Sequence, residues 1–539
     1  MIPLVLAIGI ISGIFIGKKS ADSRLSPEEL KIRTVLNLIK DQYVDQVNTD
    51  SLLDMTIPDM LASLDPHSVY IPASELQMAN DDLESSFSGI GVTFQIINDT
   101  VNVIDVVPGG PAEKTGIQPG DLIIEANGKQ LSGAKATSET VFTTLRGKEG
   151  TKVETKVKRR GSKKLLTFDI IRGIIPTNSV DAIYMITDEI GYLKVSKFAR
   201  NTYNEFFNAL VKLQKQGASQ FVIDLRGNSG GFMDQAIYMA NEFLPEGRVI
   251  VYTKGRNPEN ESLATSDGRG SFQDCEITVL INEYSASASE IFAGAIQDND
   301  RGLVIGRRSF GKGLVQNQIA LPDSSAIRLT VARYYIPSGR CIQKEYSRGK
   351  DGKYELDILD RYNHGEIYSK DSVKIDKSKK FNTVGGRTVF GGGGIIPDCF
   401  VPEDTTEYTG YYIEAVNTGM IQRFAREMVD VYRPMLKGSK AIEDVDRILP
   451  RDGALLTAFV NYGASHGLPA RWYYINISRN LIINQLRALI ARDAFGNQAF
   501  YPVFNTADKT VAEAIKVLKS GKAEFPIVDE QESEKKSKK

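Results

Sequence analysis

Residues 277–298 read ITVLINEYSASASEIFAGAIQD, and this stretch decides the fold of the central part of the chain. Residues 277–281 form a short apolar run that is typical of a buried strand. The segment that begins at Ser287 continues as a predicted helix through the apolar residues Ile291, Phe292 and Ile296. A strand followed directly by a helix is one unit of an α/β layer, so we expect a mainly parallel sheet covered by helices.

The same alternation extends to both sides of this stretch. Further strands are predicted at 190–195, 221–225, 249–253 and 303–305, and further helices at 203–216 and 234–243. This pattern predicts an α/β core over residues 173–402. The glycine-rich segment 385–397 should be a loop at the border of the core.

Residues 86–172 have a different pattern, in which short strands alternate with Gly, Pro and Asn turn signals. The runs 89–94, 101–107, 122–126, 151–160 and 165–172 are predicted as strands. Asn127-Gly128 after the third run predicts a hairpin. We therefore expect a compact β-rich module ahead of the core.

The flanking regions are predicted to be helical. Ser26-Pro-Glu-Glu29 has the cap, the proline and the early acids of a helix start, within a helical region over 21–85. His67, in the turn that ends the helices of this region, is interpreted as a turn or packing residue rather than a ligand. Helices predicted at 412–431, 454–462 and 481–492 give a C-terminal helical domain over 403–527. The charged tail 528–539 cannot bury enough apolar area to fold and is predicted to be disordered.

Residues 1–20 are predicted to be a signal or membrane-anchor segment. Residues 2–17 are apolar or small and end at Lys18-Lys19. As a helix they would span about 24 Å, less than the roughly 30 Å hydrocarbon core. No small-x-small cleavage site follows, which favours an uncleaved anchor over a removed signal. The lysines after the run favour the opposite orientation, which a truncated start without a basic leader would explain. A buried core helix is the alternative.

Composition narrows the class of protein. A chain of 539 residues should hold three or four domains. The formal charge of -1, from 66 basic and 67 acidic residues, argues against a nucleic-acid binder. Cys275, Cys341 and Cys399 are too few and too scattered for a disulfide framework or a zinc site. No metal and no cofactor is predicted.

Ser287 is the candidate nucleophile, in the cluster Ser285-Ala-Ser287-Ala-Ser289-Glu290. An alternative is that Ser287 and Glu290 form a capping box at the start of the helix. Both interpretations place the hydroxyl at a helix N-terminus, where free amides and the helix dipole stabilise developing negative charge. The six residues alone do not separate the two.

Lys312, in Phe310-Gly-Lys312-Gly313, is the candidate base. A serine needs a neighbour to take its proton, and a neutral lysine can do so where no histidine serves. Burial can lower a lysine pKa from about 10.4 to roughly 5–6. In an extended chain Gln316 would share a face with Lys312 and could orient it. The alternative is an ordinary exposed loop lysine.

A second serine competes with Ser287. Gly227-Asn-Ser229-Gly-Gly231 follows a predicted strand and matches the G-x-S-x-G elbow of α/β-hydrolases. That fold would need His364 or His466 as a partner, and neither lies in an obvious place for it. The other interpretation of these glycines is a turn whose backbone amides bind an oxyanion.

Three motifs together resemble the carboxyl-terminal processing peptidases, also called tail-specific proteases. They are Asp224-Leu-Arg-Gly-Asn-Ser-Gly-Gly231, Ser285-Ala-Ser-Ala-Ser-Glu290 and Phe310-Gly-Lys-Gly-Leu-Val-Gln316. Leu64-Asp-Pro-His-Ser68 and Gly393-Gly-Ile-Ile-Pro-Asp398 also fit, so the resemblance covers roughly residues 25–400. It implies a multidomain α+β protein with a crotonase-like α/β protease core and helical N- and C-terminal regions. Nothing is carried over onto the region after 403.

The resemblance also implies roles for individual residues. Ser287 would be the nucleophile, Lys312 the general base and Gln316 its orienter. The backbone amides of Gly231 and Ala288 would form the oxyanion hole. Family members are exported, ATP-independent serine endopeptidases. This implies an extracytoplasmic, periplasmic-side enzyme, tethered to the cytoplasmic membrane of a bacterium by the N-terminal segment.

The β-rich module 86–172 is similar to a PDZ domain. PDZ domains hold a free carboxylate in the backbone amides of a Gly-x-Gly loop and add the peptide as a strand. Here that loop would be Gly89-Ile90-Gly91-Val92. We therefore expect protein or peptide substrates with free, apolar C-termini that are cleaved near that end. A catalytically inactive PDZ scaffold is the rival class, and the oligomeric state is left open.

Overall fold

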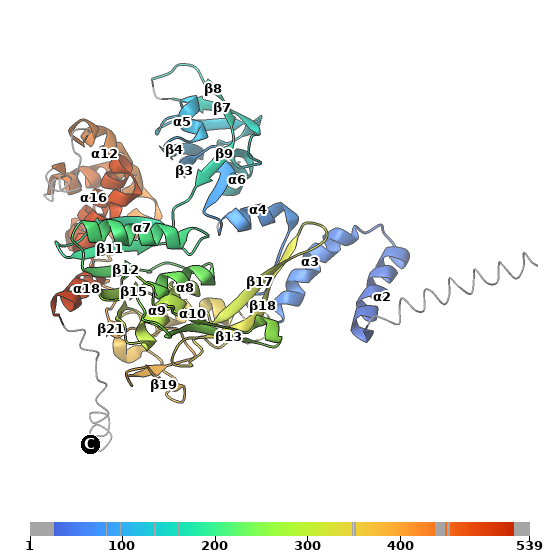
Figure 1. Ribbon diagram of the computed structural model, residues 1–539. Coiled ribbons are helices and arrows are strands. Elements are labelled where there is room, and N and C mark those ends of the chain that lie inside the picture. The colour runs from blue at the N-terminus through green and yellow to red at the C-terminus, as the bar shows by residue number, and fades with distance from the viewer. Residues whose placement is uncertain are drawn as a thin grey trace, which may run out of the picture. The chain divides into compact units, whose positions relative to one another are not determined.

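The computed structural model describes residues 26–521 except 82, 98, 134–135, 160, 348, 350–351, 437–447 and 450–452. The predicted anchor segment 1–20 and the charged tail 528–539 lie outside the described residues. The chain divides into two compact units (Figure 1). The smaller unit comprises residues up to 74 together with 317–329 and 347–351, and the larger unit comprises the rest.

The smaller unit is built from two helices and a short strand pairing. The helix α2 (Pro27–Gln42) begins at the predicted cap, because Ser26 and Glu29 form a capping box there. The helix α3 (Thr49–Ala62) follows, and β1 (Val69–Ile71) pairs antiparallel with β18 (Ala326–Tyr335), opposite residues 326–328. The turn between α3 and β1 is held by Asp65, whose carboxylate accepts from the amides of His67 (2.8 Å) and Ser68 (3.0 Å). His67 therefore lies in a turn, as predicted.

The larger unit begins with the predicted β-rich module. Its elements are β2 (Ser86–Gly89), β3 (Val92–Ile97), β4 (Thr100–Val106), α5 (Pro111–Thr115), β5 (Leu122–Ala126), β6 (Lys129–Gln130), α6 (Ser138–Leu145), β7 (Lys152–Lys158), β8 (Leu166–Ile171) and β9 (Gly173–Pro176). The sheet has the order β3-β4-β5-β7-β8, with β6 paired to β5, and β2 pairs separately with β9. The predicted hairpin joins β5 to β6, and both Asn127 (φ 47°) and Gly128 (φ 75°) have the positive φ of a tight turn. The module has its own apolar core.

The α/β core contains a six-stranded sheet of order β10-β11-β12-β15-β16-β21. Its strands are β10 (Val180–Met185), β11 (Ile190–Val195), β12 (Gln220–Asp224), β15 (Glu276–Ile281), β16 (Leu303–Gly306) and β21 (Cys399–Phe400). From β11 onward every neighbouring pair is parallel, and β10 is antiparallel to β11. The predicted parallel sheet is confirmed, and 277–298 forms β15 and the helix α9 (Ala288–Asp298).

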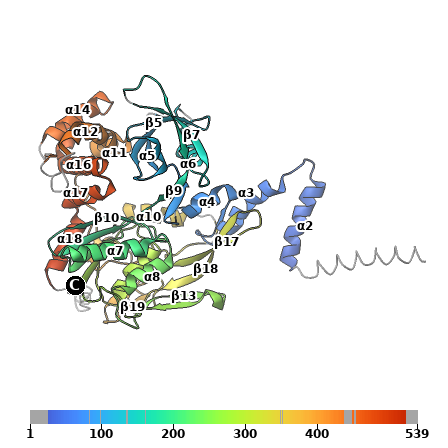
Figure 2. The same cartoon turned by 45° about the horizontal axis from the view of Figure 1, so that its top comes forward.

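Side chains on alternate positions of these strands enter two different apolar cores. Leu193 and Ile223 pack with the helices α7 (Thr202–Lys215), α8 (Met233–Asn241) and α9 on one face. Tyr192 and Val222 face the other way and pack with the helix α18 (Lys509–Lys519). Figure 2 shows α18 beside the strands of this sheet. Because both faces are covered, the central residues of these strands are mostly apolar on both faces.

A second sheet and several short elements complete the core. The strands β13 (Val249–Gly255) and β14 (Ser262–Thr265) pair with each other, and β13 also pairs with the 332–335 end of β18. The strand β17 (Leu314–Ala320) pairs with β18 and follows the loop that contains Lys312. The remaining elements are α4 (Ala73–Asp81), α10 (Lys353–Asn363), β19 (Lys380–Asn382) and β20 (Thr388–Phe390).

The C-terminal helices surround a separate apolar core. They are α11 (Gly410–Asn417), α12 (Met420–Leu436), α14 (Gly453–Ser465), α15 (Trp472–Ile477), α16 (Arg479–Phe495) and α17 (Phe500–Phe504). The single helix predicted over 412–431 is wrong, because the chain breaks at Gly419, which has a φ of 65°. Glycine adopts this conformation without strain, whereas a helix cannot continue through it. Helices are found at the other two predicted places.

Candidate active site

The fold brings two loops together at one edge of the parallel sheet. β12 and β15 are parallel neighbours, so the loops that follow them leave from the same edge. The first loop contains Asn228, and the second contains Ser285 and Ser287. The main-chain carbonyl of Asn228 accepts from the amide of Ala286 (3.0 Å) and from Oγ of Ser289 (2.9 Å). Asn228 is fully buried and fixes the two loops to each other.

The structure distinguishes the three serines of the cluster. Ser285 is buried and donates its hydroxyl to the carbonyl of Leu225 (2.9 Å). Ser289 is buried and donates to the carbonyl of Asn228. Ser287 is partly exposed and has φ 55° and ψ −114°, a conformation that costs a non-glycine residue free energy. Strain of this kind persists where the surrounding structure enforces it, and functional sites are the usual places.

Glu290 connects the loop of Ser287 to the loop of Lys312. Its Oε2 atom accepts the amide of Ser287 (2.8 Å) and the amide of Lys312 (2.9 Å). Its Oε1 atom accepts the amide of Gly311 (2.7 Å) and the hydroxyl of Ser309 (2.5 Å). The capping-box relationship between Ser287 and Glu290 is present, but the same carboxylate also holds the segment that carries the candidate base.

The Glu290 carboxyl is fully buried. Burial raises its pKa to about 7, although the hydrogen bonds from Ser309, Lys312, Gly311 and Ser287 act in the opposite direction. Every one of these donors matches an ionised carboxylate, which only accepts. The site therefore contains a carboxylate that changes its charge near neutral pH.

Tyr334, on β18, makes a second connection between the same two residues. Its hydroxyl donates to the carbonyl of Lys312 (2.6 Å) and lies 3.1 Å from the carbonyl of Ser287. The ring is 1% exposed. Glu290 thus holds the amides of Ser287 and Lys312, and Tyr334 holds their carbonyls. The relative position of the two candidate catalytic residues is fixed through their backbones.

Gly230 lies against Ser287, the candidate nucleophile, and Gly231 lies against Phe198. A Cβ atom on Gly230 would be 2.7 Å from Cβ of Ser287 and 3.0 Å from the amide nitrogen of Ala288. A Cβ atom on Gly231, where φ is 141°, would be 2.1 Å from the carbonyl oxygen of Phe198. Only glycine fits at either position. Among the described residues, no acceptor is found for the amide of Gly231 or for that of Ala288, as the predicted oxyanion hole requires.

Lys312 lies immediately before β17 and is partly buried. Gln316, two residues into that strand, donates its side-chain amide to Oγ1 of Thr330 (3.3 Å). The role of Gln316 as an orienter of Lys312 stays a prediction.

Among the residues that the structure describes, no hydrogen bond joins Ser229 of the competing elbow to a histidine. Ser229 is exposed. His364 pairs with Glu366 (3.3 Å), and His466 stacks on Tyr462 with ring centroids 4.0 Å apart. Neither contact involves Ser229. The loop places Gly230 against Ser287, and the second interpretation of the motif, a turn whose backbone amides bind an oxyanion, stays a prediction.

The predicted carboxylate-binding loop is the turn between β2 and β3. The carbonyl of Gly91 accepts the amide of Val107 (3.0 Å), and the carbonyl of Ile90 accepts that of Ala112 (2.8 Å). Gly91 has φ 77°, and a Cβ atom there would be 2.9 Å from Cδ1 of Ile175. Two carbonyls of the loop are thus used within the module. The roles of Gly89, Ile90, Gly91 and Val92 in holding a C-terminus stay predictions.

Arg226 anchors the start of the loop that contains Gly230 and Gly231. Its guanidinium pairs with Asp224 (2.6 Å) and with Asp508 of the C-terminal region (2.8 Å). Its main-chain carbonyl accepts from the ammonium of Lys194. Burial by itself raises the pKa of Asp224, but Arg226 and Lys194 hold that pKa well below its ordinary value. The sequence motif contained Asp224 and Arg226 but gave no sign of Asp508.

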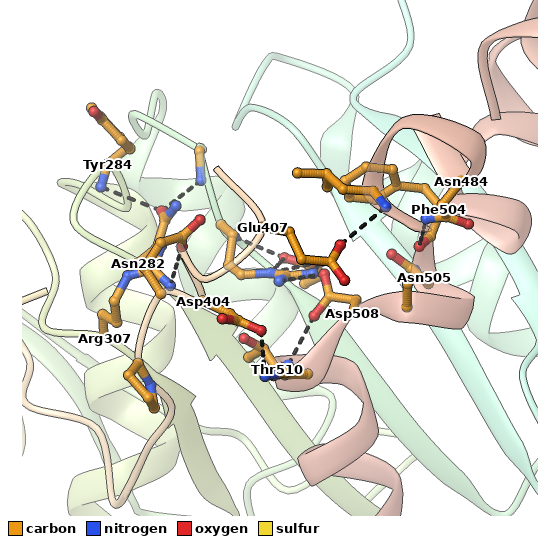
Figure 3. A pocket seen from close by; sticks show the side chains of 18 of the residues that line it. Asn282, Tyr284, Arg307, Asp404, Glu407, Asn484, Phe504, Asn505, Asp508 and Thr510 are labelled. Atoms are coloured by element: carbon orange, nitrogen blue, oxygen red, sulfur yellow. Dashed lines mark hydrogen bonds and ion pairs between the residues drawn. The ribbon is translucent and has the colours of Figure 1, made fainter. Parts of the chain in front are cut away.

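A pocket borders this loop, and residues of the core and of the C-terminal helices line it together (Figure 3). Its volume is about 720 Å³. Arg307 lies in the wall of the pocket. Its guanidinium forms one ion pair with the Glu283 carboxylate and another with the Glu403 carboxylate, each with an N–O distance of 2.8 Å. Sequence reasoning missed this pocket because its walls are far apart along the chain.

Comparisons with known proteins agree with this geometry. Residues 189–350 match peptidase family S41, residues 88–170 match the PDZ domain, and residues 16–74 match the activating protease CtpB N-terminal domain. Residues 411–496 match a family of unknown function, DUF8443. Within the described residues, no group of His, Cys, Asp and Glu is arranged to hold a metal ion.

Three curated relatives have similar sequences over most of their length. The carboxy-terminal-processing protease of Bartonella bacilliformis is 38% identical over 314 residues, which are 57% of this chain and 71% of the relative. A probable CtpA-like serine protease of Staphylococcus aureus is 35% identical over 355 residues, which are 65% of this chain and 69% of the relative. The carboxy-terminal processing protease CtpB of Bacillus subtilis is 32% identical over 364 residues, which are 67% of this chain and 74% of the relative. The chain therefore belongs to the carboxy-terminal processing proteases, serine-type peptidases of family S41 with a PDZ domain.

Proposed function

We propose that this protein is an endopeptidase with a Ser287–Lys312 dyad that selects substrates by their free C-terminus. The observation that supports the dyad most strongly is the pair of connections through Glu290 and Tyr334, which hold the backbones of both residues. Such a double attachment fixes a nucleophile and a base relative to each other, as proximity catalysis requires.

The proposed reaction has two halves. Neutral Lys312 takes the proton from Oγ of Ser287, and Oγ attacks the scissile carbonyl carbon. The resulting oxyanion accepts from the amides of Gly231 and Ala288. The tetrahedral intermediate collapses when the Lys312 ammonium returns the proton to the leaving amine, which leaves an acyl-enzyme. Water then attacks the ester, with Lys312 again acting as the base.

Single substitutions test the dyad. Ser287→Ala and Lys312→Ala should each abolish cleavage of an unfolded protein with an apolar C-terminus, and their effects should not add. Ser229→Ala should be milder. Full loss in Ser229→Ala with normal cleavage by Ser287→Ala would favour the α/β-hydrolase elbow. An inactive wild type that still binds peptides would favour the PDZ scaffold.

The PDZ module is proposed to hold the substrate carboxylate at Gly89-Ile90-Gly91-Val92. Amidation of the substrate C-terminus removes the charge that these amides would receive, so binding should weaken by roughly 1.5–3 kcal/mol, or about 10- to 150-fold. The measurement compares free-acid and amidated versions of one peptide. Equal binding and equal cleavage would mean that the module does not recognise C-termini.

The proposed location is the extracytoplasmic side of a bacterial membrane, with residues 1–20 as the anchor. No helix of the described part of the chain is long and apolar enough to span a membrane, so the proposal rests on this N-terminal segment alone. Fractionation of cells that express the full chain or a chain without residues 1–20 tests it. Membrane association of both chains would contradict the assigned anchor.

A further inference from the structure

The pocket of about 720 Å³ lies at the edge of the sheet that carries the active site (Figure 3). Lys194, Asp224 and Asn282 are lining residues at or just beyond the ends of β11, β12 and β15. The opposite wall comes from α16, α17 and the start of α18. In open α/β sheets, ligands bind at the carboxyl ends of the strands. The C-terminal helices therefore enclose a space where this type of sheet receives ligands.

The pocket is joined to the nucleophile by a row of contacts between the two active-site loops. Gly227 and Asn282, which both line the pocket, are linked by a hydrogen bond of 2.8 Å from the Gly227 amide to Oδ1 of Asn282. Gly230 lies against Ser287 at the other end of the row. Gly230 follows Gly227 by three positions along the chain, and these span at most about 11 Å. An extended substrate advances about 3.3 Å per residue, so its third residue from the scissile bond reaches the pocket.

The wall of the pocket does not offer free positive charge. Arg226 and Arg307 each lie between two carboxylates, as described above. The other two cations of the wall, Lys194 and Lys509, pair with Asp224 and Asp404. An anionic side chain would have to displace one of these carboxylates. Acidic ligands are therefore disfavoured.

The wall does offer negative charge and an unused acceptor. Within the described residues, the Glu407 side chain has no cationic partner, and its Oε2 accepts only the amide of Leu481 (3.0 Å). Oδ1 of Asn505, a residue that is 7% exposed, has no hydrogen-bond partner in the part of the chain that the structure describes. Figure 3 shows Asn505 beside Asp508 at the pocket. A carboxylate and a buried acceptor both require a donor, and a cation is the strongest donor available.

Aromatic rings complete the wall. Tyr284, which is 48% exposed, and Tyr408, which is 40% exposed, both line the pocket. Aromatic faces attract ammonium and guanidinium groups. We infer that the pocket is a substrate subsite for a lysine or arginine side chain about three residues from the scissile bond. The inference rests on the proposed protease function and adds a second specificity element to the recognition of the C-terminus.

The test uses the full chain and peptides with one free apolar C-terminus. The bond that the wild type cleaves in a parent peptide is located by mass spectrometry. Lys, Gln or Glu is then placed in turn at the second, third and fourth positions on each side of that bond. We expect kcat/KM to be about tenfold higher for Lys than for Glu at the third position on one side, which is the size of one charge-assisted hydrogen bond.

Glu407→Gln identifies the pocket as the source of this preference. Glutamine keeps the acceptor for the Leu481 amide and removes the charge, so the ratio of Lys to Glu rates should fall at least about threefold. Glu414→Gln, on α11 outside the pocket, is the control and should leave the ratio unchanged. Equal rates for Lys, Gln and Glu at every position, or an unaltered ratio in Glu407→Gln, would overturn the inference.

A binding measurement separates failure of the inference from failure of the proposed function. Ser287→Ala should hold the same peptides without cleaving them, and it should bind the Lys peptide more tightly than the Glu peptide. If the wild type cleaves no peptide but Ser287→Ala shows this preference, the protease proposal fails and the basic subsite stands. If the wild type cleaves well and Ser287→Ala binds both peptides equally, the subsite fails and the protease proposal stands.

Discussion

Replacement of Glu290 by glutamine tests whether one buried carboxylate holds the dyad together. The four donors around it are the amides of Ser287, Lys312 and Gly311 and the hydroxyl of Ser309. A glutamine can direct its oxygen to only one pair of them, so its NH₂ group must face the other pair. At least one buried amide then loses its acceptor, which costs about 1–3 kcal/mol of folding stability.

The effect on activity should be larger than the effect on stability. If the loops of Ser287 and Lys312 shift relative to each other by about 1 Å, kcat/KM should fall about 100-fold. Glu242→Gln is a matched control, because Glu242 is 5% exposed and accepts the Ser271 amide (2.9 Å) and the Tyr203 hydroxyl (2.7 Å) away from the site. It should lose a similar amount of stability and keep its activity.

The pH dependence gives a second readout. Burial raises the pKa of Glu290 to about 7, well above the ordinary value of a glutamate. The folded protein therefore binds this proton more tightly than the unfolded chain does. The resulting stabilisation is complete below about pH 4.5 and is lost as the pH rises through about 7, by roughly 3 kcal/mol in total. This part of the pH dependence should be missing in Glu290→Gln, as urea unfolding at several pH values would show.

The same proton should affect catalysis in the opposite direction. The ionised carboxylate holds the amides of Ser287 and Lys312, and the proposed base is neutral Lys312, so two deprotonations should favour activity. On the acid side of the profile, log kcat/KM should approach a slope of 2 in the wild type and of 1 in Glu290→Gln. A Glu290→Gln enzyme with wild-type kcat/KM and a wild-type slope would refute the role assigned to this residue.

Three further predictions follow from other contacts. Tyr334→Phe removes the hydroxyl shared by the carbonyls of Ser287 and Lys312, so kcat/KM should fall about tenfold. Tyr203→Phe is the control and should stay active. Equal activity of the two variants would contradict the connection through Tyr334. Gly231→Ala places a Cβ atom 2.1 Å from the Phe198 carbonyl and should abolish activity. Gly247→Ala, also at positive φ but with open space around it, should be tolerated. An active Gly231→Ala enzyme would contradict the requirement for glycine at this position. Chelators should not change the rate, because the proposed proton path uses only Ser287 and Lys312, and inhibition that zinc reverses would sink this mechanism.

The sequence predicted the parts of the fold that depend on local pattern. The segment 277–298 folds as the predicted strand and helix, because a buried apolar run and a helix start are both visible within a few residues. The break at Gly419 was missed because the apolar spacing continues on both sides of it. Contacts between distant segments leave no such pattern. Tyr334 lies 47 positions from Ser287, and Asp508 lies 282 positions from Arg226.

The two interpretations of Ser287-x-x-Glu290, a helix cap and a catalytic group, were posed as alternatives, and the structure explains why they are compatible. A cap needs an acceptor at the first amides of a helix, and α9 begins at the residue next to Ser287, the proposed nucleophile. The Glu290 carboxylate satisfies the cap with Oε2 and has capacity left, because each carboxylate oxygen can accept two hydrogen bonds. The amides of Lys312 and Gly311 use that capacity.

An apolar residue at 290 would leave these donors buried without partners, whereas an exposed cap elsewhere in the chain, such as Ser26, serves its helix alone. A buried carboxylate with a pKa raised to about 7 is therefore the consequence of joining the helix start to the loop of the base.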